Sequence, residues 1–178
     1  MDHAKKFIFI LGGVRSGKSH YAVSTAIKIC KKVAFIATCI SPDVEMKERI
    51  KQHKASRPRH WKVFEAGKDI KSIFAKLEDV YEIVIIDCLS LWISSLLMEG
   101  LKDYQIHKIL KELTHAISQF GFTTILVSNE VGCGIVPDNY LARRFRDIAG
   151  FANQMMATEA DEVFLMSAGI PVKIKGET

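Results

Sequence analysis

The chain has 178 residues, 48% of them hydrophobic, and a formal net charge of +5. This size and apolar content suit one compact domain, so we expect residues 1–178 to form a single domain. The basic residues are dispersed along the chain without a basic tail, which suits anionic small ligands better than nucleic acid. The four cysteines form no C-x-x-C pair, which argues against zinc and for reduced thiols. The apolar runs are too short for a signal peptide or a membrane span, so we expect a cytoplasmic protein.

Short apolar runs alternate with amphipathic stretches along the chain. The runs predict buried strands at Phe7–Leu11, Val33–Ala37, Ile83–Asp87, Thr123–Ser128 and Glu162–Met166, with a final strand at Val172–Lys175 after a turn at Gly169–Pro171. Helices are predicted at Ser16–Lys31, Asp43–Lys54, Asp69–Glu78, Tyr104–Phe120 and Asn139–Ala157. The less periodic segment Ala55–Gly67 is predicted to be a functional loop that leads to a short strand. This alternation predicts an α/β fold with a mainly parallel sheet and helices on both faces.

The first predicted strand runs directly into a glycine-rich turn that fits the phosphate-binding pattern G-x-x-x-x-G-K-[ST]. Glycines let the backbone N–H groups turn toward an anion, and the following helix adds the partial positive charge of its N-terminus. The lysine of the pattern reaches the β- and γ-phosphates, and the serine hydroxyl ligates Mg²⁺. The turn predicts a nucleoside triphosphate site made of Gly12, Gly13, Val14, Arg15, Ser16, Gly17, Lys18 and Ser19.

An acidic residue, Asp87, ends the strand at Ile83–Asp87. An aspartate after a strand is commonly a turn or cap residue. Beside a phosphate loop, however, such an acid holds Mg²⁺ or its water. We therefore predict that Ser19 and Asp87 ligate Mg²⁺.

A histidine, His53, lies among cations near the end of the second predicted helix. Arg49 precedes it by about one turn, and Lys54 and Arg57 follow it. Neighbouring positive charges favour the neutral imidazole, which is a nucleophile for phosphorus. This arrangement is compatible with a covalent histidine–nucleotide intermediate. From spacing alone, however, a solvated histidine at a helix end is the more common case.

The whole chain resembles the bifunctional adenosylcobinamide kinase / adenosylcobinamide-phosphate guanylyltransferase family of cobalamin biosynthesis. The resemblance rests on GGVRSGKS, FIATC, the segment R-I-x-x-H-K-x-x-R-P-x-x-W, DCLSLW, the segment from SNEVGCGIVP to GFANQ, and ADEVFLMSAGIPVKIK. It implies a RecA-like P-loop domain, usually a homotrimer. It also implies two reactions: phosphorylation of adenosylcobinamide by ATP or GTP, then transfer of GMP from GTP to the product through a GMP–histidine intermediate, releasing pyrophosphate.

The resemblance also implies roles for particular residues. His53 corresponds to the guanylylated histidine, and Lys18 is the second catalytic residue. Beyond the glycine-rich turn, the nucleotide contacts implied are Ala37, Thr38, Cys39, Lys54, Ala55, Ser56, Arg57, Glu65 and Asp87.

Several further residues have roles that the sequence leaves open. Glu130 follows a predicted strand and could accept the substrate hydroxyl proton, hold Mg²⁺ through water, cap a helix or brace its loop. His60, next to Trp61, could orient phosphate or pack on the surface. Three arginines could face the corrinoid phosphate, a neighbouring subunit or solvent, with Arg143 paired to Asp147; they are Arg143, Arg144 and Arg146.

Two other functions fit parts of the pattern. One is a small-molecule P-loop kinase without guanylyltransfer, which would form no GMP adduct. The other is a RecA-like, nucleic-acid-dependent ATPase, which the net charge permits. The chain lacks the aromatic-rich basic stretch of a strand-binding groove, which disfavours the second.

Overall fold

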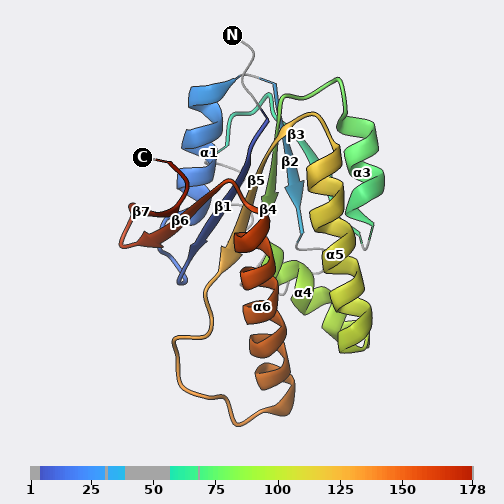
Figure 1. Cartoon of the computed structure of the whole chain (residues 1–178), viewed down its shortest axis with the longest axis vertical. Helices are drawn as coiled ribbons and strands as arrows, with labels where there is room; N and C mark the ends of the chain where they lie inside the picture. The colour runs from blue at the N-terminus through green and yellow to red at the C-terminus, as the bar shows by residue number, and fades with distance from the viewer. Residues whose placement is uncertain (1–4, 31, 39–56, 68, 178) are drawn as a thin grey trace.

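One seven-stranded sheet forms the centre of the molecule (Figure 1). The computed structural model describes residues 5–30, 32–38, 57–67 and 69–177. Neighbouring strands are parallel except for the last pair, which is antiparallel. Across the sheet the strands follow the order β3 (Lys62–Glu65), β2 (Val33–Ala37), β4 (Ile83–Asp87), β5 (Thr123–Asn129), β1 (Phe7–Gly12), β6 (Glu162–Ser167) and β7 (Ile170–Lys175).

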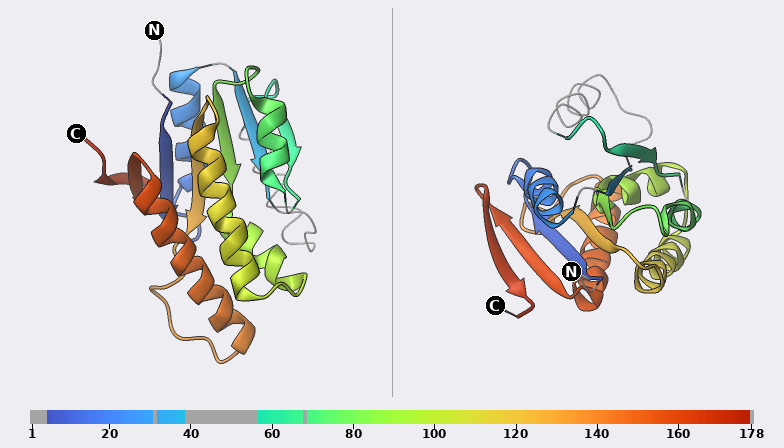
Figure 2. Two further views of the ribbon diagram at one scale, coloured as in Figure 1. Left: turned by 45° about the vertical axis from the view of Figure 1, so that its right-hand side comes forward. Right: turned by 90° about the horizontal axis from the view of Figure 1, so that it is seen from above.

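Helices cover both faces of the sheet, as Figure 2 shows from above. One face is covered by α1 (Lys18–Ile29). The other face carries α3 (Ile70–Leu77), α4 (Leu89–Met98), α5 (Asp103–Gln119) and α6 (Tyr140–Glu159). The predicted fold class is therefore confirmed. The predicted helix Asp43–Lys54 lies outside the described residues.

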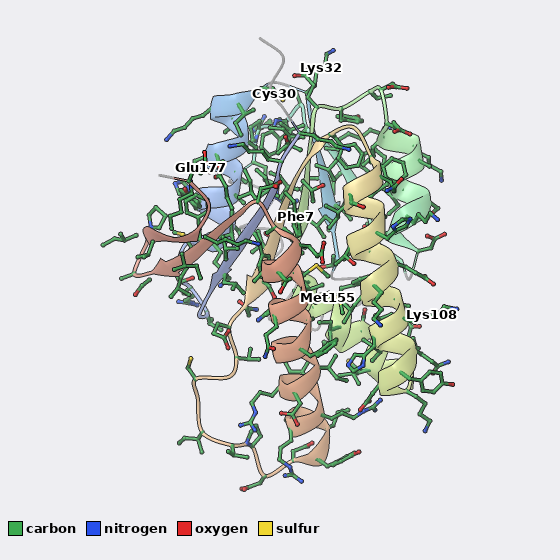
Figure 3. The ribbon with its side chains drawn as sticks, viewed as in Figure 1. Phe7, Cys30, Lys32, Lys108, Met155 and Glu177 are labelled. Atoms are coloured by element: carbon green, nitrogen blue, oxygen red, sulfur yellow. The ribbon has the colours of Figure 1, made fainter. Side chains whose placement is uncertain are left out.

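The two hydrophobic cores follow from the alternation of side chains along β1. Phe7 and Phe9 point to the face covered by α3, α4, α5 and α6, whereas Ile8 and Ile10 point to the α1 face. Met155 of α6 packs against the same core as Phe7, and both are labelled in Figure 3. Because both faces are covered, β1 is apolar at every position, which is the pattern expected of a central parallel strand.

Helix α4 is not among the predicted helices. Six of its ten residues are buried, and they lie around most of its circumference: Leu89, Ser90, Trp92, Ile93, Leu96 and Leu97. A helix that is buried on most sides has no polar face, so its sequence lacks the amphipathic periodicity that indicates a helix. The indole Nε1 of Trp92 donates to the Gly67 carbonyl at 3.0 Å, which ties α4 to the segment after β3.

The turn between β6 and β7 lies earlier than predicted. Ala168 and Gly169 form it, with positive φ values of 49° and 85°. Two successive positive φ values are typical of the tight turns that join antiparallel strands. Ile170 and Pro171 therefore belong to β7, and the predicted turn at these positions is wrong. Pro171 is tolerated because β7 is an edge strand, where a missing N–H breaks no ladder.

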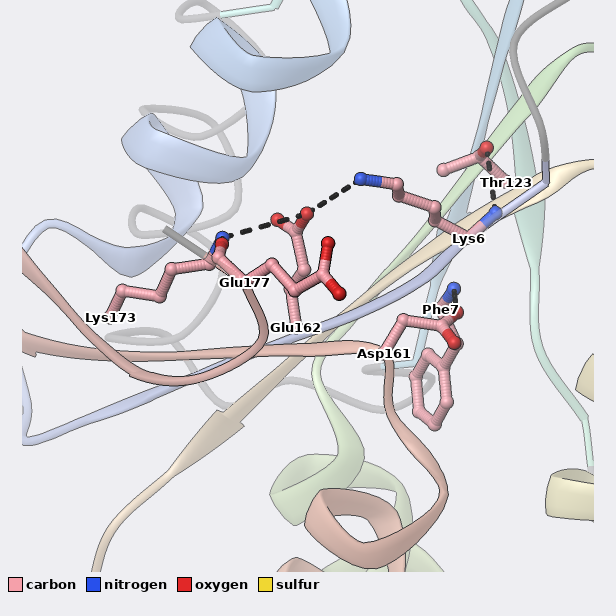
Figure 4. Close-up of polar contacts among 7 residues, drawn as sticks. All are labelled: Lys6, Phe7, Thr123, Asp161, Glu162, Lys173 and Glu177. Atoms are coloured by element: carbon pink, nitrogen blue, oxygen red, sulfur yellow. Dashed lines mark hydrogen bonds and ion pairs between the residues drawn. The ribbon is translucent and has the colours of Figure 1, made fainter.

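A cluster of charged groups anchors the β6–β7 hairpin to β1 (Figure 4). The Glu162 carboxylate accepts from Lys6 Nζ at 2.7 Å and lies 3.7 Å from Lys173 Nζ. The hydrogen bond from Lys6 lowers the pKa of Glu162, and the same bond raises the pKa of Lys6. Asp161 Oδ2 accepts from the Phe7 N–H at 2.7 Å. The start of β1 is thus fixed to the start of β6.

Within the part of the chain that the structure describes, none of the helices has both the length and the apolar character needed to cross a membrane.

Candidate active site

The glycine-rich turn lies between the end of β1 and the start of α1, as its sequence predicts. Gly12 and Gly17 have φ values of 154° and 92°. A side chain at Gly12 would place Cβ 2.5 Å from the Met166 carbonyl oxygen, so only glycine fits there. The left-handed conformation of Gly17 delays α1 to Lys18, two residues after the predicted start.

Lys18 lies inside the turn with its side chain folded back over the loop. It is only 7% exposed, and its Nζ donates to the Gly13 carbonyl at 2.5 Å and to Ser16 Oγ at 3.3 Å. Burial lowers the pKa of the Lys18 ammonium, while electrostatic interaction with the side chains of Cys88 and Asp87 acts in the opposite direction. A buried cation among backbone amides is an arrangement that favours an anionic phosphate.

The carboxyl ends of β2, β3 and β4 lie side by side at the same edge of the sheet as this turn. Ala37 is in register with Glu65 on one side and with Asp87 on the other. Thr38 is fully buried, and its Oγ1 accepts from the Cys88 N–H at 2.7 Å and donates to the Cys88 carbonyl at 2.8 Å. The threonine therefore links the segment after β2 to the segment after β4 and fixes the backbone around Asp87.

Arg57 has an incompletely used guanidinium group at the same edge. Its Cζ lies 3.4 Å from the centroid of the Phe35 ring, a close cation–π stack. Its Nη1 is buried without a hydrogen-bond partner among the described residues. Burial lowers the pKa of Arg57, and the charge of Asp87 opposes this shift. Asp87 thus acts electrostatically on both Lys18 and Arg57.

Cys88 follows Asp87, and its buried thiol is unreactive. Burial raises the pKa of its thiol to about 12, and the charge of Asp87 adds to the effect. Its Sγ lies 3.2 Å from Ser90 Oγ, which accepts from Asn129 Nδ2 at 3.0 Å. This group stays a neutral thiol at physiological pH and packs the site.

The predicted residues fall into two groups. The structure brings together the glycine-rich turn, Ala37, Thr38, Arg57, Glu65 and Asp87 at one edge of the sheet, with the Glu65 side chain exposed. The other predicted contacts lie outside the described residues, namely Cys39, His53, Lys54, Ala55 and Ser56. Within the described ranges of the chain, no three His, Cys, Asp or Glu side chains cluster as a metal site.

The candidates left open by the sequence now have definite contacts. Glu130 Oε1 accepts from the Gly132 N–H at 2.7 Å, so the side chain braces its own loop. Arg143 donates to the carbonyls of Pro137 and Asp138 at 3.0 Å and 2.6 Å. Of the alternatives that the sequence left open, the ion pair of Arg143 with Asp147 is therefore not the contact found among the described residues.

The remaining open candidates are also located. Arg144 binds Asp103 Oδ1 at 2.5 Å and the Leu101 carbonyl at 2.6 Å, which joins the start of α6 to the start of α5. Arg146 lies 3.7 Å from Asp147 and is the residue that pairs with it. His60 is exposed.

A buried polar residue on α6, Asn153, is one that sequence reasoning missed. Its Oδ1 accepts from Ser128 Oγ at 2.7 Å, and its Nδ2 donates to the Asn129 carbonyl at 3.1 Å. It therefore holds the end of β5 beside the glycine-rich turn. A polar residue on the apolar face of an otherwise amphipathic helix is the signal that could have identified it.

The parallel strand order, the glycine-rich turn and the enclosed Lys18 define a P-loop nucleotide-binding protein with a RecA-like fold. Residues 8–174 match the CobU family, described as cobinamide kinase / cobinamide phosphate guanyltransferase. The chain belongs to this family and is an enzyme of cobalamin biosynthesis.

Three similar proteins support this membership over nearly the whole chain. The bifunctional adenosylcobalamin biosynthesis protein CobU of Escherichia coli (strain K12) is 39% identical over 180 residues, covering 94% of this chain and 99% of the relative. The corresponding CobU of Salmonella typhimurium is 38% identical over the same length and coverage. CobP of Pseudomonas aeruginosa is 37% identical over 168 residues, covering 94% and 96%.

A solved structure of an ATPase from the type III secretion system of pathogenic bacteria shares the fold. It superposes with a TM-score of 0.55 at 10% identity, over 94% of this chain. This chain spans 56% of that protein, and the likeness concerns the fold alone.

Proposed function

We propose that this enzyme phosphorylates adenosylcobinamide with ATP or GTP and then guanylylates the product through His53. The observation that supports the residue roles is the carboxyl edge of the sheet, where Lys18 lies folded over the glycine-rich turn and Asp87 ends β4. Arg57, stacked on Phe35 of β2, adds a buried Nη1 without a hydrogen-bond partner among the described residues. Two cations that lose solvation on burial gain most from a phosphate chain that replaces the lost water. The family match supplies the two reactions.

In the kinase step, the substrate hydroxyl oxygen forms a bond to the γ-phosphorus of the nucleotide, and the hydroxyl proton is released to solvent. The bond from that phosphorus to the β,γ-bridging oxygen breaks, and the nucleoside diphosphate leaves. Lys18 and the backbone N–H groups from Gly12 to Ser19 bind the β- and γ-phosphates and position the γ-phosphorus for in-line attack.

We assign Mg²⁺ to the hydroxyl of Ser19 and the carboxylate of Asp87. Both are hard oxygen ligands, and Mg²⁺ commonly takes only one or two protein ligands and completes its shell with phosphate oxygens and water. This donor set fits the ion. When bound, Mg²⁺ neutralises part of the negative charge on the phosphates.

In the second reaction, the His53 imidazole attacks the α-phosphorus of GTP, and pyrophosphate leaves. A phosphate oxygen of adenosylcobinamide phosphate then attacks the same phosphorus, the P–N bond breaks, and adenosylcobinamide-GDP forms. Lys18 assists the departure of pyrophosphate. The remaining proposed nucleotide contacts are Ala37, Thr38, Cys39, Lys54, Ala55, Ser56, Arg57 and Glu65.

The covalent adduct provides the test. After incubation with GTP alone, intact-mass measurement should show the protein gaining one GMP, and His53→Ala should remove this gain while keeping much of the kinase activity. His60→Ala, a histidine seven residues away, is the matched control and should still form the adduct. An acid-labile GMP adduct on His53→Ala would refute the assignment. A wild-type protein with kinase activity and no adduct would instead be a kinase without guanylyltransfer.

We further propose that the enzyme is a cytoplasmic homotrimer. The outer strand β7 carries exposed apolar residues at alternating positions, namely Ile170, Val172 and Ile174. Burying such a row against another copy removes apolar surface from water. Light scattering coupled to gel filtration should give three times the chain mass; the mass of one chain would contradict the trimer.

A further inference from the structure

A segment beyond the sheet carries exposed apolar side chains next to the nucleotide site. It runs from Val131 to Leu141, between β5 and the start of α6, and projects past the carboxyl edge of the strands (Figure 1). Ile135 is 96% exposed, Val136 is 59% exposed and Tyr140 is 72% exposed. Leu141 at the first turn of α6 is also exposed. Isolated exposed apolar residues are ordinary, but a run of them beside a substrate site indicates a contact surface.

The segment is tied to the phosphate-binding turn at one end. The Glu130 N–H donates to the Gly12 carbonyl at 3.0 Å, and Glu130 Oε1 accepts from the Gly132 N–H at 2.7 Å. The first residues of the segment therefore start directly from the glycine-rich turn. The segment therefore leaves the sheet on the side where the glycine-rich turn lies.

The other end of the segment is fixed to α6. Asn139 Oδ1 accepts from the N–H groups of Leu141 and Ala142 at 2.7 Å and 3.2 Å and caps the helix. Arg143 donates to the carbonyls of Pro137 and Asp138. With both ends held, the apolar residues between them are presented in a preformed arrangement, which lowers the entropic cost of binding.

We propose that the segment Val131–Leu141 binds the corrin ring of the adenosylcobinamide substrate, an inference that rests on the proposed function. The reacting hydroxyl is at the end of a short arm, so the bulky ring must remain outside the phosphate site while the arm reaches in. A corrin ring presents methyl groups and methylene stems that fit apolar side chains. Val136, Ile135 and Tyr140 supply that contact, and Arg143 is a positioning residue that holds the segment.

A matched pair of valines tests the proposal. Val136 is in the segment, whereas Val80 is 55% exposed before β4, at the opposite edge of the sheet. Val136→Asp should raise the KM for adenosylcobinamide in the kinase reaction by about tenfold or more, because a charge replaces an apolar contact. Ile135→Ser, which adds no charge, should raise it in the same direction. Val80→Asp should leave it unchanged.

Formation of the GMP adduct from GTP alone requires no corrinoid, so it separates this proposal from the proposed function. Val136→Asp and Ile135→Ser should form the adduct at the wild-type rate with an unchanged KM for GTP. Absence of the adduct in the wild-type protein would refute the guanylyltransfer, whereas an unchanged KM for adenosylcobinamide in both variants would overturn the corrin surface. A change of molar mass in these variants would also overturn it, since the surface would then join copies of the chain.

Cys133 gives a measurement that is independent of catalysis. It is exposed within the segment between Gly132 and Gly134. Adenosylcobinamide should slow alkylation of Cys133 by iodoacetamide several-fold, as measured by peptide mapping, and should leave alkylation of Cys30 unchanged. Equal alkylation of Cys133 with and without adenosylcobinamide would overturn the proposal.

Discussion

At the scale of single residues, the site combines groups that are costly to bury with a ligand that offsets the cost. Lys18 and Arg57 are cations withdrawn from solvent, and burial lowers the pKa of each. Asp87 is the negative residue that moderates both. Such a site lowers the stability of the ligand-free protein and raises its affinity for the ligand.

Replacing Lys18 with methionine separates these two properties. The folded-state pKa of Lys18 lies below the ordinary 10.5, so between those two values the unfolded chain binds more protons and the free energy of unfolding rises with pH. Below that window the buried charge destabilises the fold. Lys18→Met should therefore unfold at an equal or higher urea concentration at pH 7 without nucleotide, and should lack the rise in alkaline solution.

The same substitution should lower both activities about 100-fold or more, because it removes a preorganised cation from the phosphates. Kinase turnover and the rate of adduct formation are the two measurements. A Lys18→Met protein with full turnover in either reaction would contradict the use of one phosphate loop for both.

At the scale of secondary-structure elements, polar and charged contacts fix the position of the elements around the site. Asn153 joins α6 to the end of β5, and Glu162 joins β6 to β1 and β7. Neither contact could be derived from local sequence, because each partner is distant along the chain. The sequence predicted α6, β1, β5 and β6 because their own periodicity defines them, whereas β7 begins two residues before its predicted start.

Asn153→Ala should destabilise the fold by about 1–3 kcal/mol, because Ser128 Oγ and the Asn129 carbonyl lose their buried partner. Urea unfolding at pH 7 measures the change. Gln154→Ala, on the exposed side of the same helix, is the control and should change it little. If Ser128→Ala and Asn153→Ala have fully additive effects, their contact contributes no coupling energy.

Glu162→Gln should cost about 1 kcal/mol or less at pH 7, since its lysine partners are partly exposed. The pKa of Glu162 is lowered, so its contribution is present above its ordinary 4.5 and is lost as pH falls through the lower folded value. The free energies of unfolding of the wild-type and Glu162→Gln proteins, measured by urea unfolding, should therefore converge as the pH is lowered. Glu112→Gln, in an exposed pair 3.9 Å from Lys108, is the control and should change the free energy of unfolding little at pH 7.

At the scale of the whole molecule, the class of fold could be predicted from the alternation of strands and helices, but their spatial order could not. Nothing in the apolar runs states that β1 lies between β5 and β6, since that order depends on crossovers between distant segments. α4 was not predicted because a helix buried on most sides has no amphipathic periodicity in its sequence. The burial of Arg57 Nη1 without a hydrogen-bond partner among the described residues could likewise not be derived from the sequence, although Arg57 itself was predicted as a nucleotide contact.

Nucleotide binding should stabilise the molecule as a whole. GTP at about 100 times its dissociation constant should add roughly 2.7 kcal/mol, which for a chain of this length raises Tm by roughly 5–10 °C. Differential scanning fluorimetry with and without GTP and Mg²⁺ measures the shift. Lys18→Met should show a much smaller shift at the same GTP concentration; an equal shift would place the phosphates elsewhere.

The turn between β6 and β7 reaches back to the phosphate loop: the Gly169 N–H donates to the Ser16 carbonyl at 3.0 Å, and the Met166 carbonyl faces Gly12. β1 also pairs only with β5 and β6 among the described strands. During synthesis on the ribosome, the residues of the phosphate loop therefore emerge early. The contacts that complete the loop can form only after residues near 169 have emerged. Retention on immobilised GTP should thus select finished chains over nascent or truncated ones.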